Sequence, residues 1–167
     1  MVEYLTQQQI RRLRELAKAP RDYLLIEVQY QTGCSVSELV DIKKTDVTPT
    51  FIRIQGRKCF ITQTLAKQLL SYAQSHDSEY VFATRQSPQL TQKRVQQIVK
   101  GYLNKLSADI YKKTPHILRY THIAHAIKQH IPFSAIKEQT GLGDLRLSQL
   151  FSELSEEEPQ DYGRVFA

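Results

Sequence analysis

The chain has 167 residues, of which 41% are hydrophobic and 24% are charged, and its net charge is +6. This length is enough for one domain with a hydrophobic core and is short for two. No apolar run approaches the roughly 20 residues that span a bilayer, and the N-terminus has no apolar signal core. We therefore expect a cytoplasmic protein with no membrane segment. The two cysteines show no pairing pattern, which indicates reduced thiols rather than a disulfide framework.

The charge is distributed unevenly along the chain. Residues 1–152 contain 22 basic and 12 acidic residues, whereas the end of the chain is acidic. A basic body favours a polyanionic partner, because each neutralised phosphate releases condensed counterions. A solvated, mildly basic surface would give the same composition, so the charge alone leaves both interpretations open.

The first half of the chain predicts three helices followed by a β-hairpin. The expected bounds are helices over 7–19, 21–33 and 35–41 and a hairpin over 51–64. Thr6 is an N-cap for the first helix, and Gly33 is a C-cap for the second. The hairpin segment alternates with the two-residue period of strands on either side of Gly56.

The second half predicts five more helices and one strand. The expected elements are a helix over 65–76, a strand over 80–84, a long helix that starts after Pro88 with Thr91 as its cap, and helices over 116–131, 134–141 and 145–154. Together the two halves predict a mainly α fold with a small antiparallel β-sheet (α+β). We expect one domain over 1–155 and an acidic C-terminal tail over 156–167.

Five segments carry recognisable residue patterns and follow one another in a fixed order. They are YQTGCSVSELVDIKKTDV, the hairpin IRIQGRKCFITQTL, the segment 80–84 with the helix behind it, TPHILRYTHIAHAI and TGLGDLRLSQL. In this order they resemble the tyrosine recombinases of the phage integrase family. The fourth is similar to the family's Thr-Pro-His-x-Leu-Arg-His-Thr box and is the most specific. The resemblance covers residues ~20 to ~155 and implies the catalytic-domain fold of that family.

The resemblance also implies a chemistry. A tyrosine attacks a DNA phosphodiester and forms a covalent phosphotyrosine, while two arginines and a histidine or tryptophan bind the non-bridging oxygens. A lysine on the hairpin protonates the leaving 5′ oxygen. The resemblance therefore implies double-stranded DNA as the partner, in DNA integration and recombination. We expect no cofactor and no metal.

Part of that site can be assigned to this sequence through the resemblance. His116 and Arg119 match the His-x-x-Arg pair, and Glu38 matches an acidic residue that supports the site. The hairpin lysine has two candidates, Arg57 and Lys58. Lys58 is the better proton donor, because an arginine hardly deprotonates. A packing role remains an alternative for both residues of the pair: Arg119 would be held by Glu38, and His116 by backbone groups.

Three other positions of the site carry unsuitable residues. Ser35 stands where the first arginine is expected, Asp144 where the histidine or tryptophan is expected, and Glu153 where the nucleophile is expected. Losing one preorganised donor costs roughly 10²–10³ in rate. We therefore expect no strand cleavage. Tyr162, further along the chain, is an alternative nucleophile.

Further basic residues are candidates for contacts with DNA phosphates. In addition to Arg57, Lys58 and Arg119, they are Lys93, Arg94 and Lys100 of the long helix, with ordinary solvation as the alternative. His122 and His125 are predicted to be surface histidines rather than zinc ligands. The N-terminal core-binding domain of the family is expected to be absent.

Three hypotheses of function follow. The first is a catalytically inert, integrase-like DNA-binding protein that acts as a regulator or accessory factor on a mobile element. The second is an active but divergent recombinase that uses Tyr162 as its nucleophile, either in cis or donated in trans to another copy. The third is a protein-interaction module that docks on a partner recombinase through its C-terminal helix and acidic tail.

Overall fold

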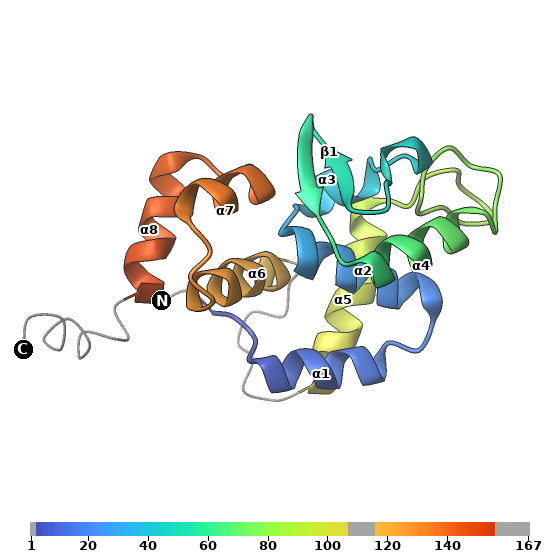
Figure 1. The fold of residues 1–167 in the computed structure, drawn as a ribbon. Helices are drawn as coiled ribbons and strands as arrows, with labels where there is room; N and C mark the ends of the chain where they lie inside the picture. The colour runs from blue at the N-terminus through green and yellow to red at the C-terminus, as the bar shows by residue number, and fades with distance from the viewer. Residues whose placement is uncertain (1–2, 107–115, 156–167) are drawn as a thin grey trace, which may run out of the picture.

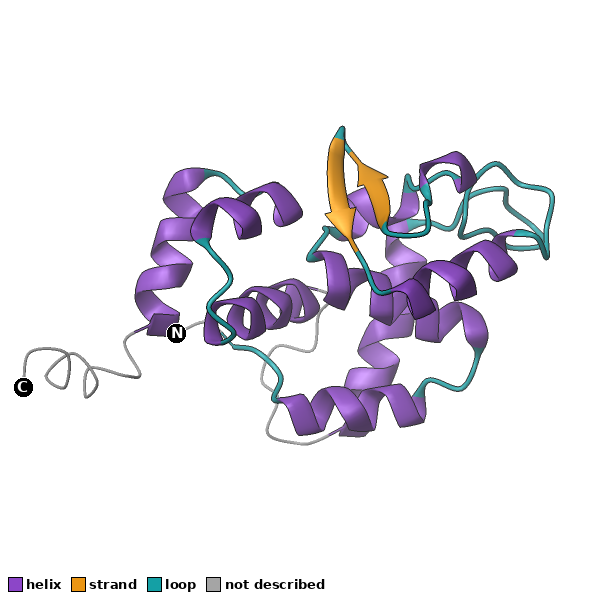
Figure 2. Ribbon diagram, in the orientation of Figure 1, coloured by secondary structure: helices purple, strands orange, loops and turns teal. Residues whose placement is uncertain are grey.

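The structure is mainly helical, and a two-stranded antiparallel sheet lies between α3 and α4 in chain order (Figures 1 and 2). The computed structural model describes residues 3–106 and 116–155. Its elements are α1 (Gln7–Leu16), α2 (Pro20–Thr32), α3 (Val36–Val40), the 3-10 helix η1 (Lys44–Asp46), β1 (Phe51–Ile54), β2 (Arg57–Phe60), α4 (Gln63–Ala73), α5 (Gln92–Leu106), α6 (His116–Lys128), α7 (Phe133–Thr140) and α8 (Asp144–Ser155). The mainly α fold with one small antiparallel sheet is thus confirmed. In the described segments no helix combines the length and the apolar character needed to cross a bilayer.

Local capping bonds set the helix ends that the sequence predicts. The side chain of Thr6 accepts a hydrogen bond from the backbone N–H of Gln9, and the Gln9 side chain accepts one in return, which forms a capping box. Gly33 ends α2 in the left-handed conformation, with a φ of 68°. Thr91 accepts a hydrogen bond from the N–H of Arg94 at 3.2 Å and so caps the start of α5. These three predictions are confirmed.

The strand predicted over 80–84 is wrong. Only Tyr80 makes a β-bridge, an isolated one with Lys43. Val81 and Phe82 are buried, so their apolar character reflects packing in the core rather than a sheet. The hairpin is also shorter than predicted, because Thr62 caps α4 by accepting a hydrogen bond from the N–H of Leu65 at 3.2 Å.

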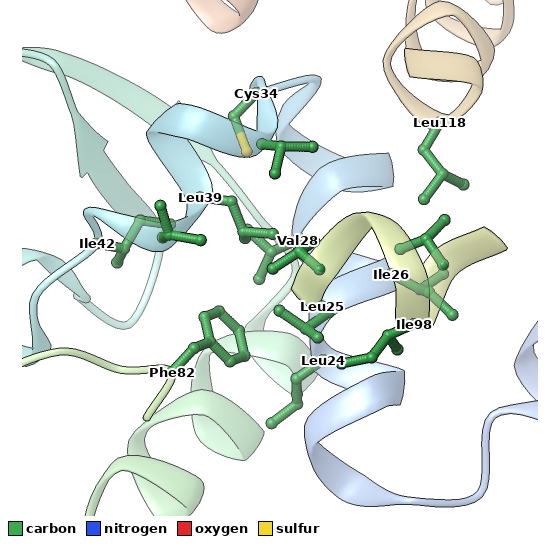
Figure 3. Packing of buried hydrophobic residues seen from close by; sticks show 14 of the residues in the cluster. Leu24, Leu25, Ile26, Val28, Cys34, Leu39, Ile42, Phe82, Ile98 and Leu118 are labelled. Atoms are coloured by element: carbon green, nitrogen blue, oxygen red, sulfur yellow. The ribbon is translucent and has the colours of Figure 1, made fainter. Parts of the chain in front are cut away.

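The core consists of two hydrophobic clusters. The larger one surrounds α2, where Leu24, Leu25 and Val28 meet Leu39 and Phe82 (Figure 3). The smaller one joins the second half of α6 to α7 and α8. Helix α6 belongs to both, since its first turn contributes to the larger cluster and its later turns to the smaller one. Helix α6 therefore joins α7 and α8 to the larger cluster, and α7 also packs on β2.

Two histidines of α6 are built into this packing, so the prediction of surface histidines is wrong. His122 Nδ1 donates to the carbonyl of Tyr30 at 2.7 Å. His125 Nε2 donates to the carbonyl of Leu5 at 2.8 Å, and its Nδ1 accepts from the Tyr30 hydroxyl at 2.6 Å. Burial lowers the pKa of both imidazoles, that of His122 to about 4. Within residues 3–106 and 116–155, no group of three or more His, Cys, Asp or Glu side chains could hold a metal ion.

The buried His122 makes stability depend on pH. Its folded-state pKa of about 4 lies below the ordinary 6.5, so the unfolded chain binds the extra proton more readily. The stability that neutral His122 provides is therefore present above pH 6.5 and is lost as the pH falls toward 4, by about 3 kcal/mol. Denaturant unfolding from pH 7 to pH 4 should show a shallower pH dependence for His122→Gln than for the wild type. His116→Gln, at an exposed histidine of the same helix, is the control; equal slopes for the wild type and His122→Gln would contradict the prediction.

Candidate nucleic-acid interface

An open groove of about 740 Å³ runs between the β-hairpin and α7. In Figure 1 the hairpin stands beside α7, with α6 below them. The groove is lined by Gly56, Arg57, Lys58, Phe60, Ser134, Lys137, Glu138, Gly141 and Leu142. Two of the candidate residues from the hairpin, Arg57 and Lys58, thus lie in one concave surface.

Gln139 of α7 fixes the hairpin against this helix. Its side-chain oxygen accepts from the N–H of Phe60 at 2.9 Å, and its nitrogen donates to the carbonyl of Phe60 at 2.7 Å. The same nitrogen donates to the carbonyl of Gln31 at 3.1 Å. One side chain therefore pairs with the outer edge of β2 as a neighbouring strand would. No pattern in the sequence indicates this role, because an isolated glutamine on a helix has no distinctive spacing.

Successive residues of β2 point to opposite sides, and this separates the two candidates for the hairpin lysine. Lys58 is exposed, and its ammonium lies 5.2 Å from the centre of the Phe51 ring. Arg57 points inward, and only 19% of its side chain is exposed. The two residues thus differ in what they can do, since Lys58 faces solvent whereas Arg57 belongs to a packed charged cluster.

That cluster centres on the carboxylate of Glu38. Arg57 Nη1 donates to Glu38 Oε2 at 2.8 Å, while Glu38 Oε1 accepts from the N–H of Ser35 at 3.0 Å. Burial alone would raise the pKa of Glu38, but the hydrogen bonds from Arg57 and Ser35 outweigh it and lower the pKa. Glu38 is therefore an ionised carboxylate that joins α3 to the hairpin. Its salt-bridge partner is Arg57, so the alternative in which Glu38 holds Arg119 for packing is wrong.

Arg119 lies next to this pair without bonding to it. Its Nη2 donates to the carbonyl of Thr140 at 2.7 Å, at the end of α7. Burial lowers the pKa of Arg119. The negative charge of Glu38 opposes this decrease, whereas the positive charge of Arg57 adds to it, so the three charged groups interact. The guanidinium of Arg57 lies against the adjacent Gly141, whose missing Cβ leaves the space that it fills. The structure thus brings Glu38, Arg57 and Arg119 together, whereas His116 is exposed at the first residue of α6.

Two of the three positions with unsuitable residues have clear structural roles. Ser35 is the N-cap of α3, and its hydroxyl accepts from the N–H of Glu38 at 3.2 Å. Asp144 begins α8 and forms an ion pair with Lys137 at 2.7 Å. Glu153 is exposed on α8, beside the buried Leu154. Tyr162 and the acidic tail lie outside the described residues.

The remaining basic candidates lie elsewhere. Lys93, Arg94 and Lys100 are exposed on α5, which packs on α1, α2 and α3 and does not line the groove. One basic residue of the groove was missed, Lys137, which lines it directly. It looks like an ordinary solvated helix residue in the sequence, and only the packing of α7 on β2 places it here.

Comparison with known proteins gives the family that the sequence patterns resemble, and the match extends along the whole described chain. The model of the phage integrase family matches residues 3–158. Among curated relatives, the tyrosine recombinase XerA of Thermococcus kodakarensis is 28% identical over 168 residues, and XerD of Pasteurella multocida is 24% identical over 180. These matches cover 92% and 93% of this chain but 58% and 59% of the relatives, so the chain spans a little over half of their length.

Solved structures agree with the sequence matches. A crystal structure of XerA recombinase superimposes with a TM-score of 0.81 at 25% identity and covers 94% of this chain and 62% of that one. XerH recombinase bound to a palindromic difH substrate has the same TM-score at 18% identity, over 99% of this chain and 53% of that one, and shows the fold alone. With the family model matched over nearly the whole chain, this protein belongs to the phage integrase family, the tyrosine recombinases, and has the fold of their catalytic domain.

Proposed function

We propose that this chain binds double-stranded DNA through the groove between the hairpin and α7 and does not itself cleave a strand. The observation that carries this proposal is the gathering of Arg57, Lys58 and Lys137 on one concave surface, with Arg119 beside it. Cationic side chains in a groove suit a polyanion whose phosphates they can neutralise. The XerH structure, bound to a difH substrate, supports a DNA partner for this fold.

The residues at the other expected site positions favour binding without cleavage. Ser35 offers a short neutral hydroxyl, which cannot present the bidentate cation that a phosphate binds. Asp144 places a negative charge, 71% exposed, close to the groove-lining Lys137 and so weakens the attraction of that lysine for a phosphate. Glu153 has no phenolic oxygen with which to form a phosphotyrosine. We infer a role as a regulator or accessory factor in DNA recombination on a mobile element.

Two alternatives lead to different measurements. An active recombinase that uses Tyr162 in cis or in trans requires a covalent protein–DNA intermediate. A module that docks on another recombinase is favoured by Leu145 of α8, whose large apolar side chain is 76% exposed. Docking through this residue would make Leu145→Glu lose the complex with the partner while DNA binding persists.

The absence of cleavage can be tested with a nicked suicide duplex. We expect no band of covalent adduct on a denaturing gel for the wild type, because Glu153 has no phenolic oxygen with which to form a stable phosphotyrosine link. An adduct that disappears in Tyr162→Phe would contradict the proposal and establish the active alternative. An adduct that persists in Tyr162→Phe would contradict it as well and point to another nucleophile.

The groove can be tested with a pair of exposed lysines. Lys58→Gln removes a cation from the groove, whereas Lys67→Gln removes one from α4, in a different groove lined by Tyr23 and Tyr72. If Lys58 contacts a phosphate, its loss should reduce the slope of log K against log salt by about 0.9, and Lys67→Gln should leave the slope unchanged. Fluorescence anisotropy with a labelled duplex across salt concentrations measures both. If both variants showed the same salt dependence as the wild type, the DNA would bind outside the groove and the proposal would be contradicted.

A further inference from the structure

The charged cluster beside the groove contains donors that the protein leaves unused. Arg57 Nε and Nη2 and Arg119 Nε are buried and have no oxygen or nitrogen acceptor in the structure, and the weakly accepting sulfur of Cys59 is the polar atom beside Arg57. A buried guanidinium N–H without a partner is costly, so such groups normally meet an acceptor, a water molecule or an ion. Two neighbouring arginines with three unused donors therefore form a place that an anion can complete.

The charge of the cluster indicates which anion fits. Arg57 and Arg119 contribute two positive charges and Glu38 one negative charge. The adjacent thiols of Cys34 and Cys59 are neutral, since burial raises the pKa of both, that of Cys34 to about 12. The excess of one positive charge matches a monoanion, and a phosphodiester of DNA is a monoanion with two free oxygens for such donors.

The position of Arg57 relates it to the arginine that is missing at Ser35. One carboxylate joins the two residues, because Glu38 Oε1 accepts from the N–H of Ser35 and Oε2 from Arg57 Nη1. The Glu38 carboxylate therefore bridges the Arg57 guanidinium and the backbone of Ser35, although Arg57 belongs to β2 and Ser35 precedes α3. On its other side the Arg57 guanidinium lies against Gly141, which follows Thr140, the residue whose carbonyl accepts a hydrogen bond from Arg119.

Resting on the proposed DNA binding, we propose that Arg57 replaces the arginine missing at Ser35, so that Arg57 and Arg119 together hold one phosphodiester of the bound duplex. The turn at Thr140 and Gly141 borders both guanidinium groups and the groove. Because the unused donors are buried, a phosphate in the groove reaches them only when this turn shifts, and the proposal includes that shift. The hairpin thus supplies a phosphate-binding arginine rather than a proton donor at position 57.

The test compares Arg57→Gln with a matched control on duplex DNA. Arg14 is also a half-buried arginine that pairs with a glutamate, Glu27, but it lies on α1 away from the groove. Arg57→Gln should lower the salt slope by about 0.9 and weaken binding roughly tenfold at 0.1 M salt. Arg14→Gln should leave the slope unchanged. Thermal unfolding of each variant, recorded in the same buffer, shows that the folded protein is being compared.

A second-site rescue separates binding from a merely structural role. Ser35→Arg in the Arg57→Gln background returns an arginine to the other side of Glu38, and the salt slope should recover by about 0.9. A slope that stays at the wild-type value in Arg57→Gln, or no recovery in the double variant while it remains folded, would overturn the replacement and leave DNA binding intact. No salt-dependent binding by the wild type would overturn the proposed function and this inference together.

Discussion

The carboxylate of Glu38 is the interaction on which the arrangement of the groove depends. It is 15% exposed and connects the start of α3, through Ser35, to the inward side of β2, through Arg57. Removing one partner of such a partly buried pair destabilises the fold, because the remaining charge loses its hydrogen-bonded counter-ion. Because Gln139 holds the outer edge of β2 to α7 at the same time, the hairpin is fixed from both sides. The groove between β2 and α7 therefore has a defined shape before any ligand arrives.

Helix α6 connects the charged cluster and the groove to the two hydrophobic clusters of the core. Its first turns pack into the core around α2, and its later turns form the small core with α7 and α8. His122 ties the middle of the helix to the end of α2 at Tyr30, and Arg119 ties its beginning to the end of α7 at Thr140. One helix thus sets the distance between the α3 side and the α7 side of the charged cluster.

The sequence predicted the features that local rules determine and missed those that depend on packing. Thr6, Gly33 and Thr91 have helix-end roles that follow from their side chains and spacing, and the hairpin follows from its alternation. The expected strand at Val81 and Phe82 failed because burial in the core and pairing in a sheet produce the same apolar pattern. The partner of Glu38 could not be inferred, since the choice between Arg57 and Arg119 depends on which residue of β2 faces inward. That in turn depends on the register at Arg57 and Cys59 and on the contact with Gln139.

If Arg57 makes the second contact with the phosphate, its side chain can contribute to DNA binding but not to the proton transfer that strand cleavage requires. Burial alone would lower its pKa, but the hydrogen bond to Glu38, the negative charge of Glu38 and the contact with Cys59 together outweigh burial and raise it. A guanidinium with a raised pKa binds a phosphodiester through fixed donors yet cannot release a proton to a leaving oxygen at neutral pH. At this inward position of β2 the hairpin therefore offers a firm hold on the phosphate and no general acid, and Lys58, exposed at the next position, is the proton donor that the hairpin retains. The two neighbouring residues thus have different chemistry, because holding a phosphate needs fixed charge whereas protonating a leaving oxygen needs a group that can release a proton.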